Sequence, residues 1–116
     1  MPKPELEFFD VSKLGWTPVD DRVPGLSEQI LARDAQTGAA TRLLRFEPGT
    51  NTSVAGVQAH PFWEEVFILE GSLHDLTLDL TFCKGSYACR PPGMQHGPWE
   101  APEGCITFEV RYYEHS

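Results

Sequence analysis

Basic residues are scarce in this sequence. Nine lysine and arginine residues stand against 17 aspartate and glutamate residues, so the formal charge is −8 over 116 residues. Because a negative surface repels phosphate backbones, we expect no nucleic-acid partner. Long apolar runs are also missing: no segment approaches the roughly 20 apolar residues of a membrane span, and the first residues contain no apolar signal region. We therefore expect no membrane association, and a cytoplasmic location by default.

Paired cysteines are a second absence. Cys83, Cys89 and Cys105 are an odd number, and no two of them have the C-x-x-C spacing of a redox or zinc motif. Reduced, buried thiols are the favoured interpretation, and a thiolate ligand is the less favoured one.

Helical periodicity is missing as well, and short apolar segments between glycine and proline turns take its place. Leu76, Leu78, Leu80 and Phe82 alternate with polar residues, the period of a half-buried strand. We expect strands at 29–33, 40–46, 65–69, 76–82, 86–90 and 106–113, with turns that include Glu70-Gly71. Many short strands separated by such turns are typical of an all-β sandwich or barrel.

The first 25 residues differ from the rest of the chain. Four prolines within them favour an extended arm over a helix. The arm also carries apolar residues, which suggest that it packs on a neighbouring subunit: Phe8, Phe9, Leu14 and Trp16. We therefore expect an arm at 1–25, one domain after it, and a homodimer.

One spaced motif ends in a histidine. Gly85, Pro91, Gly93 and His96 follow the pattern Gly-x5-Pro-x-Gly-x2-His. Chance gives such a set on the order of 0.002 times per chain of this composition. The Pro-Pro-Gly turn would end a strand and deliver His96 at a defined place.

Upstream, a second histidine precedes a carboxylate. His60 is followed four residues later by Glu64, and both share parity with Gln58, so an extended chain would point all three to one face. Pro61 cannot lie in the middle of a paired strand, so we expect a bend that lets His60 and Glu64 converge. Together with His96, these residues predict a mononuclear metal site inside a small barrel.

Both segments resemble the motifs of the cupin superfamily. The second motif is matched by the four residues given above. The first, His-x3-Glu-x6-Gly, is matched by His60, Glu64 and Gly71, with Gln58 where many cupins have another histidine. The run EEVFILEGSLHD looks most like the small ChrR-like cupins, which include a zinc-binding half of an anti-sigma factor and relatives of acetylacetone dioxygenase. The resemblance spans about residues 40–112 and implies a cupin jelly-roll barrel, a double-stranded β-helix, over residues 26–116.

His60, Glu64 and His96 are the predicted metal ligands. Two histidines and one carboxylate are the set found in non-haem Fe(II) oxygenases and equally in catalytic zinc sites, so the expected ion is iron or zinc, with nickel and manganese as alternatives. A buried Glu64 without a cation would be costly or protonated, a conflict that a metal removes. Gln58 is either a weak fourth ligand or a group that orients a ligand or donates to the substrate. Glu65 is expected at a solvated strand edge.

Aromatic and apolar residues flank the predicted ligands. Small-molecule pockets are mostly apolar, so one or two of four residues should line the site: Phe62, Trp63, Met94 and Trp99. Arg90 is a candidate for binding a substrate carboxylate or enolate through its forked guanidinium, although an internal salt bridge is the favoured alternative. Arg111 has the same two interpretations.

Three function classes follow from the resemblance. The first is a divalent-metal dioxygenase for a small chelating substrate, a β-diketone or an enol. The second is an isomerase, lyase or hydrolase that uses a redox-silent metal as a Lewis acid. The third is a metal-binding or sensing module without catalysis, which is disfavoured because no helical segment is visible that could grip a sigma factor.

Overall fold

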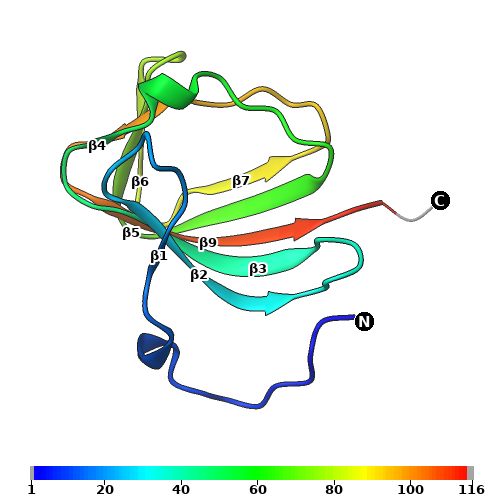
Figure 1. Ribbon diagram of the computed structural model, residues 1–116. Coiled ribbons are helices and arrows are strands. Elements are labelled where there is room, and N and C mark those ends of the chain that lie inside the picture. Colours follow the sequence, from blue (N-terminus) through cyan, green and yellow to red (C-terminus); the bar gives the residue numbers. More distant parts are fainter. Residues whose placement is uncertain (1, 115–116) are drawn as a thin grey trace.

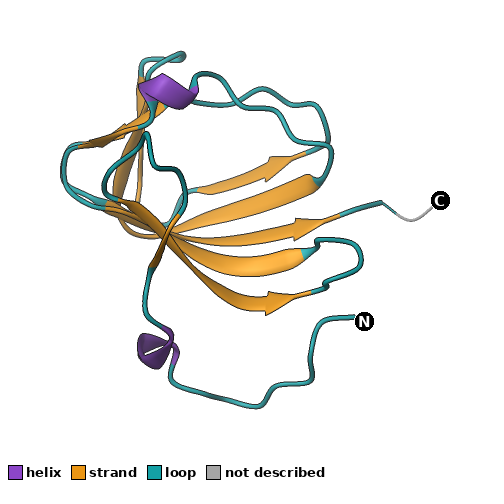
Figure 2. Ribbon diagram, viewed as in Figure 1, coloured by secondary structure: helices purple, strands orange, loops and turns teal. Residues whose placement is uncertain are grey.

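The computed structural model describes residues 2–114, and within them strands are the dominant regular structure. Figures 1 and 2 show a strongly curled antiparallel sheet. The strands are β1 (Thr17–Pro18), β2 (Leu26–Arg33), β3 (Ala40–Phe46), β4 (Thr50–Asn51), β5 (Trp63–Asp75), β6 (Leu80–Cys83), β7 (Tyr87–Arg90), β8 (Trp99–Ala101) and β9 (Cys105–Tyr112). Two short 3-10 helices, η1 (Val11–Leu14) and η2 (Ser53–Ala55), are the only helical elements among these residues. The predicted all-β class is confirmed, and none of the described helices could cross a membrane.

Strand β5 joins two layers because it is long enough to pair with four other strands. Its first half pairs with β7 on one side and β9 on the other, which extends the first layer to β7-β5-β9-β3-β2-β1. Its second half pairs with β6 and β8, and β8 pairs with β4. The two layers curl around a common interior, which lies between the upper and lower strands in Figure 1.

The predicted turn at Glu70-Gly71 is wrong, because β5 continues through it. The ladder with β9 shifts register between Ile68 and Glu70, and this irregularity lets the strand pass from one layer to the other. Gly71 has a φ of 73°, and a Cβ at this position would collide with the backbone carbonyl of Gly104. The glycine therefore marks a close crossing of two backbones and not a chain reversal.

The predicted strand at 76–82 is also wrong in its first half. Strand β5 ends at Asp75, and the chain turns before β6 begins at Leu80. The carboxylate of Asp75 accepts hydrogen bonds from the backbone N–H groups of Thr77 and Leu78 at 2.9 and 3.0 Å, which stabilises the turn. Local side-chain hydrogen bonding thus overrides the apolar alternation.

The apolar core fills only one end of the interior. It consists of Leu44, Phe46, Ile68, Leu73, Ala101 and Cys105, with Leu26, Phe82 and Trp99 packed against it. At the other end, where β7, β5 and β9 run side by side, buried polar side chains replace apolar ones, among them Glu64, Thr107 and Glu109. The interior is therefore divided into an apolar half and a polar half.

The N-terminal segment lies over the outside of β2 and β3 in its own chain. Gln29 donates a hydrogen bond from its side chain to the Val11 carbonyl at 3.1 Å, and Lys3 donates to the Thr41 hydroxyl at 2.9 Å. The guanidinium of Arg45 lies 4.3 Å from the ring centroid of Trp16. Phe8 remains fully exposed. The boundary at residue 25 and the contact with a neighbouring subunit stay predictions.

Candidate metal centre

Two loops carry the histidines, and backbone hydrogen bonds hold these loops together. Gln58 and His96 form an isolated antiparallel bridge, with N–H to carbonyl distances of 2.8 and 2.9 Å. The N–H of Gly93 donates to the His60 carbonyl at 2.8 Å. The loop that follows β7 is therefore fixed against the loop that precedes β5.

The Pro-Pro-Gly turn explains how His96 reaches this position. The N–H of Met94 donates to the Pro91 carbonyl at 3.1 Å, so Pro92 and Gly93 are the two central residues of a β-turn. Proline favours the first central position, and the second requires the positive φ that Gly93 adopts at 84° in a type II turn. The spaced motif thus encodes a specific chain reversal.

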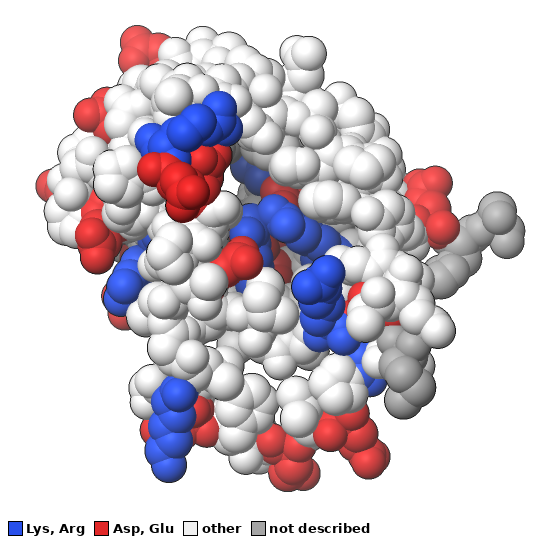
Figure 3. Space-filling model, viewed as in Figure 1, with Lys and Arg blue, Asp and Glu red and all other residues white. Residues whose placement is uncertain are grey.

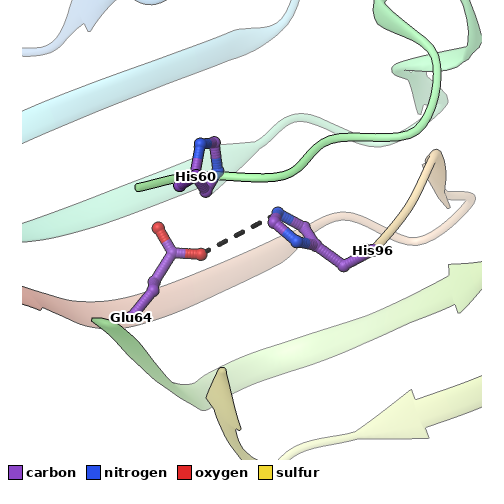
Figure 4. Close-up of side chains that lie close together, drawn as sticks. All are labelled: His60, Glu64 and His96. Atoms are coloured by element: carbon purple, nitrogen blue, oxygen red, sulfur yellow. Dashed lines mark ion pairs between the residues drawn. The ribbon is translucent and has the colours of Figure 1, made fainter. Parts of the chain in front are cut away.

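The side chains of His60, Glu64 and His96 point toward one another (Figure 4). One ligand atom from each lies within 4.8 Å of the others, and His96 Nε2 is 4.0 Å from Glu64 Oε1. Bonds of about 2.1 Å to one ion place two ligand atoms about 3.4 Å apart at the tetrahedral angle. The His96–Glu64 pair would have to close by about half an ångström and no pair by more than about 1.4 Å, so the three residues are placed to hold a single ion after a small closure.

Both imidazoles are favoured in the neutral form that binds metals. Burial lowers the pKa of His60, and burial together with the charge of Arg90 lowers the pKa of His96. His96 Nδ1 lies 3.4 Å from the Met94 carbonyl, which leaves Nε2 directed at Glu64. The ring of His60 is stacked on Phe62 with a centroid distance of 4.7 Å.

The register of the sheet places an arginine on each side of Glu64. Arg90 on β7 and Arg111 on β9 are its direct cross-strand partners. Arg90 Nη1 donates to Glu64 Oε1 and Arg111 Nε donates to Oε2, both at 2.9 Å. Burial alone would raise the pKa of this carboxyl, but the charges and hydrogen bonds of Arg111 and Arg90 outweigh it and hold the pKa below its usual value.

We call Glu64, Arg90 and Arg111 the clamp, and its two ion pairs contradict one prediction made from the sequence. A buried Glu64 was expected to need a metal, yet two guanidinium groups already compensate a carboxylate that is only 3% exposed. The burial of Glu64 is therefore not evidence for a metal by itself. Each carboxylate oxygen has two lone-pair sites, so Oε1 can accept from Arg90 and still face His96.

A second ion network lies beside the clamp. Arg42 on β3 contacts Glu109 on β9 at 2.8 Å and Glu28 on β2 at 2.5 Å. The hydroxyl of Thr107 donates to Glu109 at 2.9 Å. We call these residues and the clamp the charged floor: Glu28, Arg42, Glu64, Arg90, Glu109 and Arg111. Its charges lie on neighbouring strands from β2 to β7, and blue and red atoms lie deep in the hollow of the face shown in Figure 3.

The charged floor forms one side of a cavity of about 380 Å³. The three candidate ligands and Gln58 line it, and the apolar wall includes Leu44, Phe46, Val66 and Leu73. The amide nitrogen of Gln58 donates to the Ala55 carbonyl at 2.6 Å. Its side chain thus lies at the cavity wall and is tied to η2.

The predicted substrate-binding residues do not all line the same cavity. Arg90 and Trp99 line the central cavity and also a neighbouring one of about 370 Å³, whereas Met94 lines only the neighbouring one. Phe62 lines neither, but its ring contacts His60 and lies 4.9 Å from the Arg111 guanidinium. Trp63 lies next to Glu64 on the opposite face of β5, where it stacks on Tyr112 and donates to Glu114.

The sequence of residues 5–113 matches the family of the ChrR cupin-like domain. The chain belongs to this family. No curated protein sequence matches it significantly. The predicted jelly-roll cupin fold is supported by solved structures, although their sequence identities are low.

Three solved structures illustrate this likeness in fold. An RmlC-like cupin from Shewanella frigidimarina is 19% identical, with 100% of this chain and 97% of that chain covered at a TM-score of 0.75. An acetylacetone dioxygenase from Acinetobacter johnsonii is 16% identical, with 97% and 80% covered at 0.73. A chain from the complex of SigE with the anti-sigma ChrR of Rhodobacter sphaeroides is 19% identical, with 89% and 51% covered at 0.65.

Proposed function

We propose that this cupin binds one divalent metal ion through His60, Glu64 and His96 and acts as a mononuclear non-haem dioxygenase on a small chelating substrate, a β-diketone or an enol. The observation that carries the proposal is the convergence of these three side chains at the wall of a cavity large enough for a small molecule. The likeness to acetylacetone dioxygenase is one of fold and supports the reaction class by analogy.

Some residues of the site would bind the metal ion, and others form the wall of the substrate cavity. His60 and His96 offer neutral ring nitrogens, and Glu64 offers a carboxylate that Arg90 and Arg111 keep ionised and fixed in orientation. A bound iron ion would supply Lewis acidity and one-electron chemistry toward O2. Val66 and the apolar end of the cavity exclude water from one side of the substrate.

Metal content tests the proposed site. We expect near-stoichiometric metal in the purified protein, by inductively coupled plasma mass spectrometry, and its loss in His96→Ala. His74→Ala is the matched control, because His74 contacts Thr81 and Asp79 away from the cavity and should keep the metal. Absence of metal from the wild type, or equal loss in both variants, would overturn the ligand assignment.

Oxygen consumption tests the reaction. The iron-loaded protein should consume O2 in the presence of β-diketones or enols, and His60→Ala should abolish this. Turnover that persists without oxygen, with a redox-silent metal, would replace the dioxygenase by a Lewis-acid isomerase or lyase. A stable co-purifying protein without any turnover would indicate a sensing module.

A further inference from the structure

The two arginines of the clamp have more hydrogen-bonding capacity than Glu64 uses. Each guanidinium carries five N–H donors, and among residues 2–114 each makes one hydrogen bond, to one oxygen of Glu64. Both arginines line the central cavity. Most of their donors therefore have no acceptor in the described part of the chain, at a place where a ligand has access.

Aromatic rings hold both guanidinium groups in place. Arg111 lies 4.9 Å from the ring centroid of Phe62, and Arg90 lies 5.4 Å from that of Trp99. Contact with a ring covers a face of the guanidinium plane and leaves its N–H edges for hydrogen bonds. The arginines are thus pre-organised, which lowers the entropy cost of binding an acceptor.

The charge of the cavity differs from that of the whole chain. Four arginines and four carboxylates line it, so the cavity is formally neutral while the chain carries −8. These residues are Asp20, Arg22, Glu28, Arg42, Glu64, Arg90, Glu109 and Arg111. Within the clamp, two cations face one carboxylate, whereas in the second network two carboxylates face one cation, so the charged floor is neutral as a whole. A divalent ion at the neighbouring histidines and Glu64 would add two positive charges, which an anionic ligand would offset.

We propose that the cavity selects substrates that carry a carboxylate, bound as the anion by the spare N–H groups of Arg90 and Arg111, with a second oxygen function directed at the histidines. The inference rests on the proposed function for the role of that second oxygen, and within the class of small chelating substrates it favours keto or hydroxy acids over neutral diketones. Forked guanidinium donors match the two oxygens of a carboxylate, whereas a neutral carbonyl offers one oxygen and no charge to offset that of a bound metal ion.

Two probes of nearly equal shape test this selection. Acetoacetate has a carboxylate oxygen where acetylacetone has a methyl group, and both retain two oxygens in the 1,3 arrangement. We expect acetoacetate to bind at least about tenfold more tightly at neutral pH, measured as ligand-dependent melting shifts of the zinc-loaded and the metal-free protein, since only a ligand of the native state stabilises it. Equal affinities, or tighter binding of acetylacetone, in both forms would overturn the inference.

Variants of Arg111 test whether the preference for acetoacetate over acetylacetone comes from the clamp. Arg111→Gln should remove most of the preference for acetoacetate, and Arg111→Lys should retain a part of it, because the charge stays but the fork is lost. Arg45→Gln is the matched control, since Arg45 lies outside the cavity beneath Trp16 and should leave the preference unchanged. A preference that survives in Arg111→Gln would contradict the assignment to this arginine pair.

The outcomes separate this inference from the proposed function. If the protein binds metal and consumes O2 but shows no preference for acetoacetate, the inference fails and the function stands. If the protein binds no metal but prefers acetoacetate, the proposed function fails and the anion site stands.

Discussion

At the end of the sheet that carries the candidate site, the inner and outer faces reverse the usual distribution of side chains. On β9, Thr107 and Glu109 point inward and are 0% and 4% exposed, whereas Phe108 between them points outward and is 37% exposed. Phe67 on β5, opposite Phe108 in the ladder, is 41% exposed. In most small domains the apolar face of a strand would be buried. Here the polar face is buried at the end that lines the candidate site, while Leu44 and Ile68 on the same inner face belong to the apolar core at the other end. Burial at the polar end therefore indicates a site, and burial at the apolar end indicates packing.

The largest expected effect comes from breaking the clamp. Glu64→Gln leaves the partly buried Arg90 and Arg111 without their shared anion, and removing one partner of a buried ion network costs about 3–5 kcal/mol. We expect this loss in the free energy of unfolding, measured by urea denaturation of the metal-free protein. Glu65→Gln is the matched control on the outer face, where Glu65 accepts hydrogen bonds from Tyr87 and Tyr112, and its urea midpoint should change far less. Similar urea midpoints for Glu64→Gln and Glu65→Gln would show that the inner-face carboxylate contributes no more to stability than the outer-face one.

The second network should be structural and not functional. Arg42→Met leaves Glu28 and Glu109 without their cation, at a cost of about 3 kcal/mol by the same reasoning. Because Arg42 contacts none of the three candidate ligands, the variant should keep its metal content while its urea midpoint falls. Loss of metal in a variant that remains folded would show that the charged floor acts as one unit.

A smaller effect is expected when the outer face is changed, and it concerns the oligomeric state. The homodimer predicted from the sequence needs a surface to bury, and the exposed Phe67–Phe108 pair is such a surface. We expect the wild type to elute at twice the 13.0 kDa chain mass in size-exclusion chromatography with light scattering, and Phe108→Asp to elute as a monomer. A wild-type monomer would show that the apolar face has another role, and an unchanged dimer in Phe108→Asp would place the interface elsewhere.

The smallest effect distinguishes the three thiols. Burial, followed by the nearby charge of Glu109, raises the pKa of Cys105 to about 12, whereas Cys83 and Cys89 are exposed. A thiol reagent at pH 8 should modify two cysteines in the native protein and the third only after unfolding. Since the folded state raises this pKa, the thiol should also lower stability as pH rises above about 9, where the unfolded thiol ionises. Three equally reactive thiols would contradict the buried position of Cys105. The prediction of buried thiols is wrong for Cys83 and Cys89, which are exposed.

The turns that position the candidate ligands could be predicted from the sequence, because they depend on a few neighbouring residues. The Pro-Pro-Gly turn and the bend at Pro61 are encoded by residues with restricted backbone angles, and the structure brings His60, Glu64 and His96 together as their spacing suggested. The predicted strand at 40–46 is confirmed with the same bounds.

The arginine clamp could not be predicted in the same way. That Arg111 faces Glu64 depends on the register between β5 and β9, which are far apart in the sequence, and register is a tertiary property. The second network depends likewise on the register of β3 with β9. Strands β1, β4 and β8 have only two or three residues, too few to show a period. The alternation on β9 indicated a strand but could not say which face was inside.

The length of β5 has a consequence for how the chain folds. This one strand pairs with β6, β7, β8 and β9, and Gly71 near its middle crosses Gly104, which lies just before β9. The arginine partners of Glu64 arrive from β7 and from the final strand, so the carboxylate gains its full compensation only when the last part of the chain docks. Such non-local pairing slows folding, and we expect a refolding time in the millisecond-to-second range, with the candidate metal site among the last regions to form.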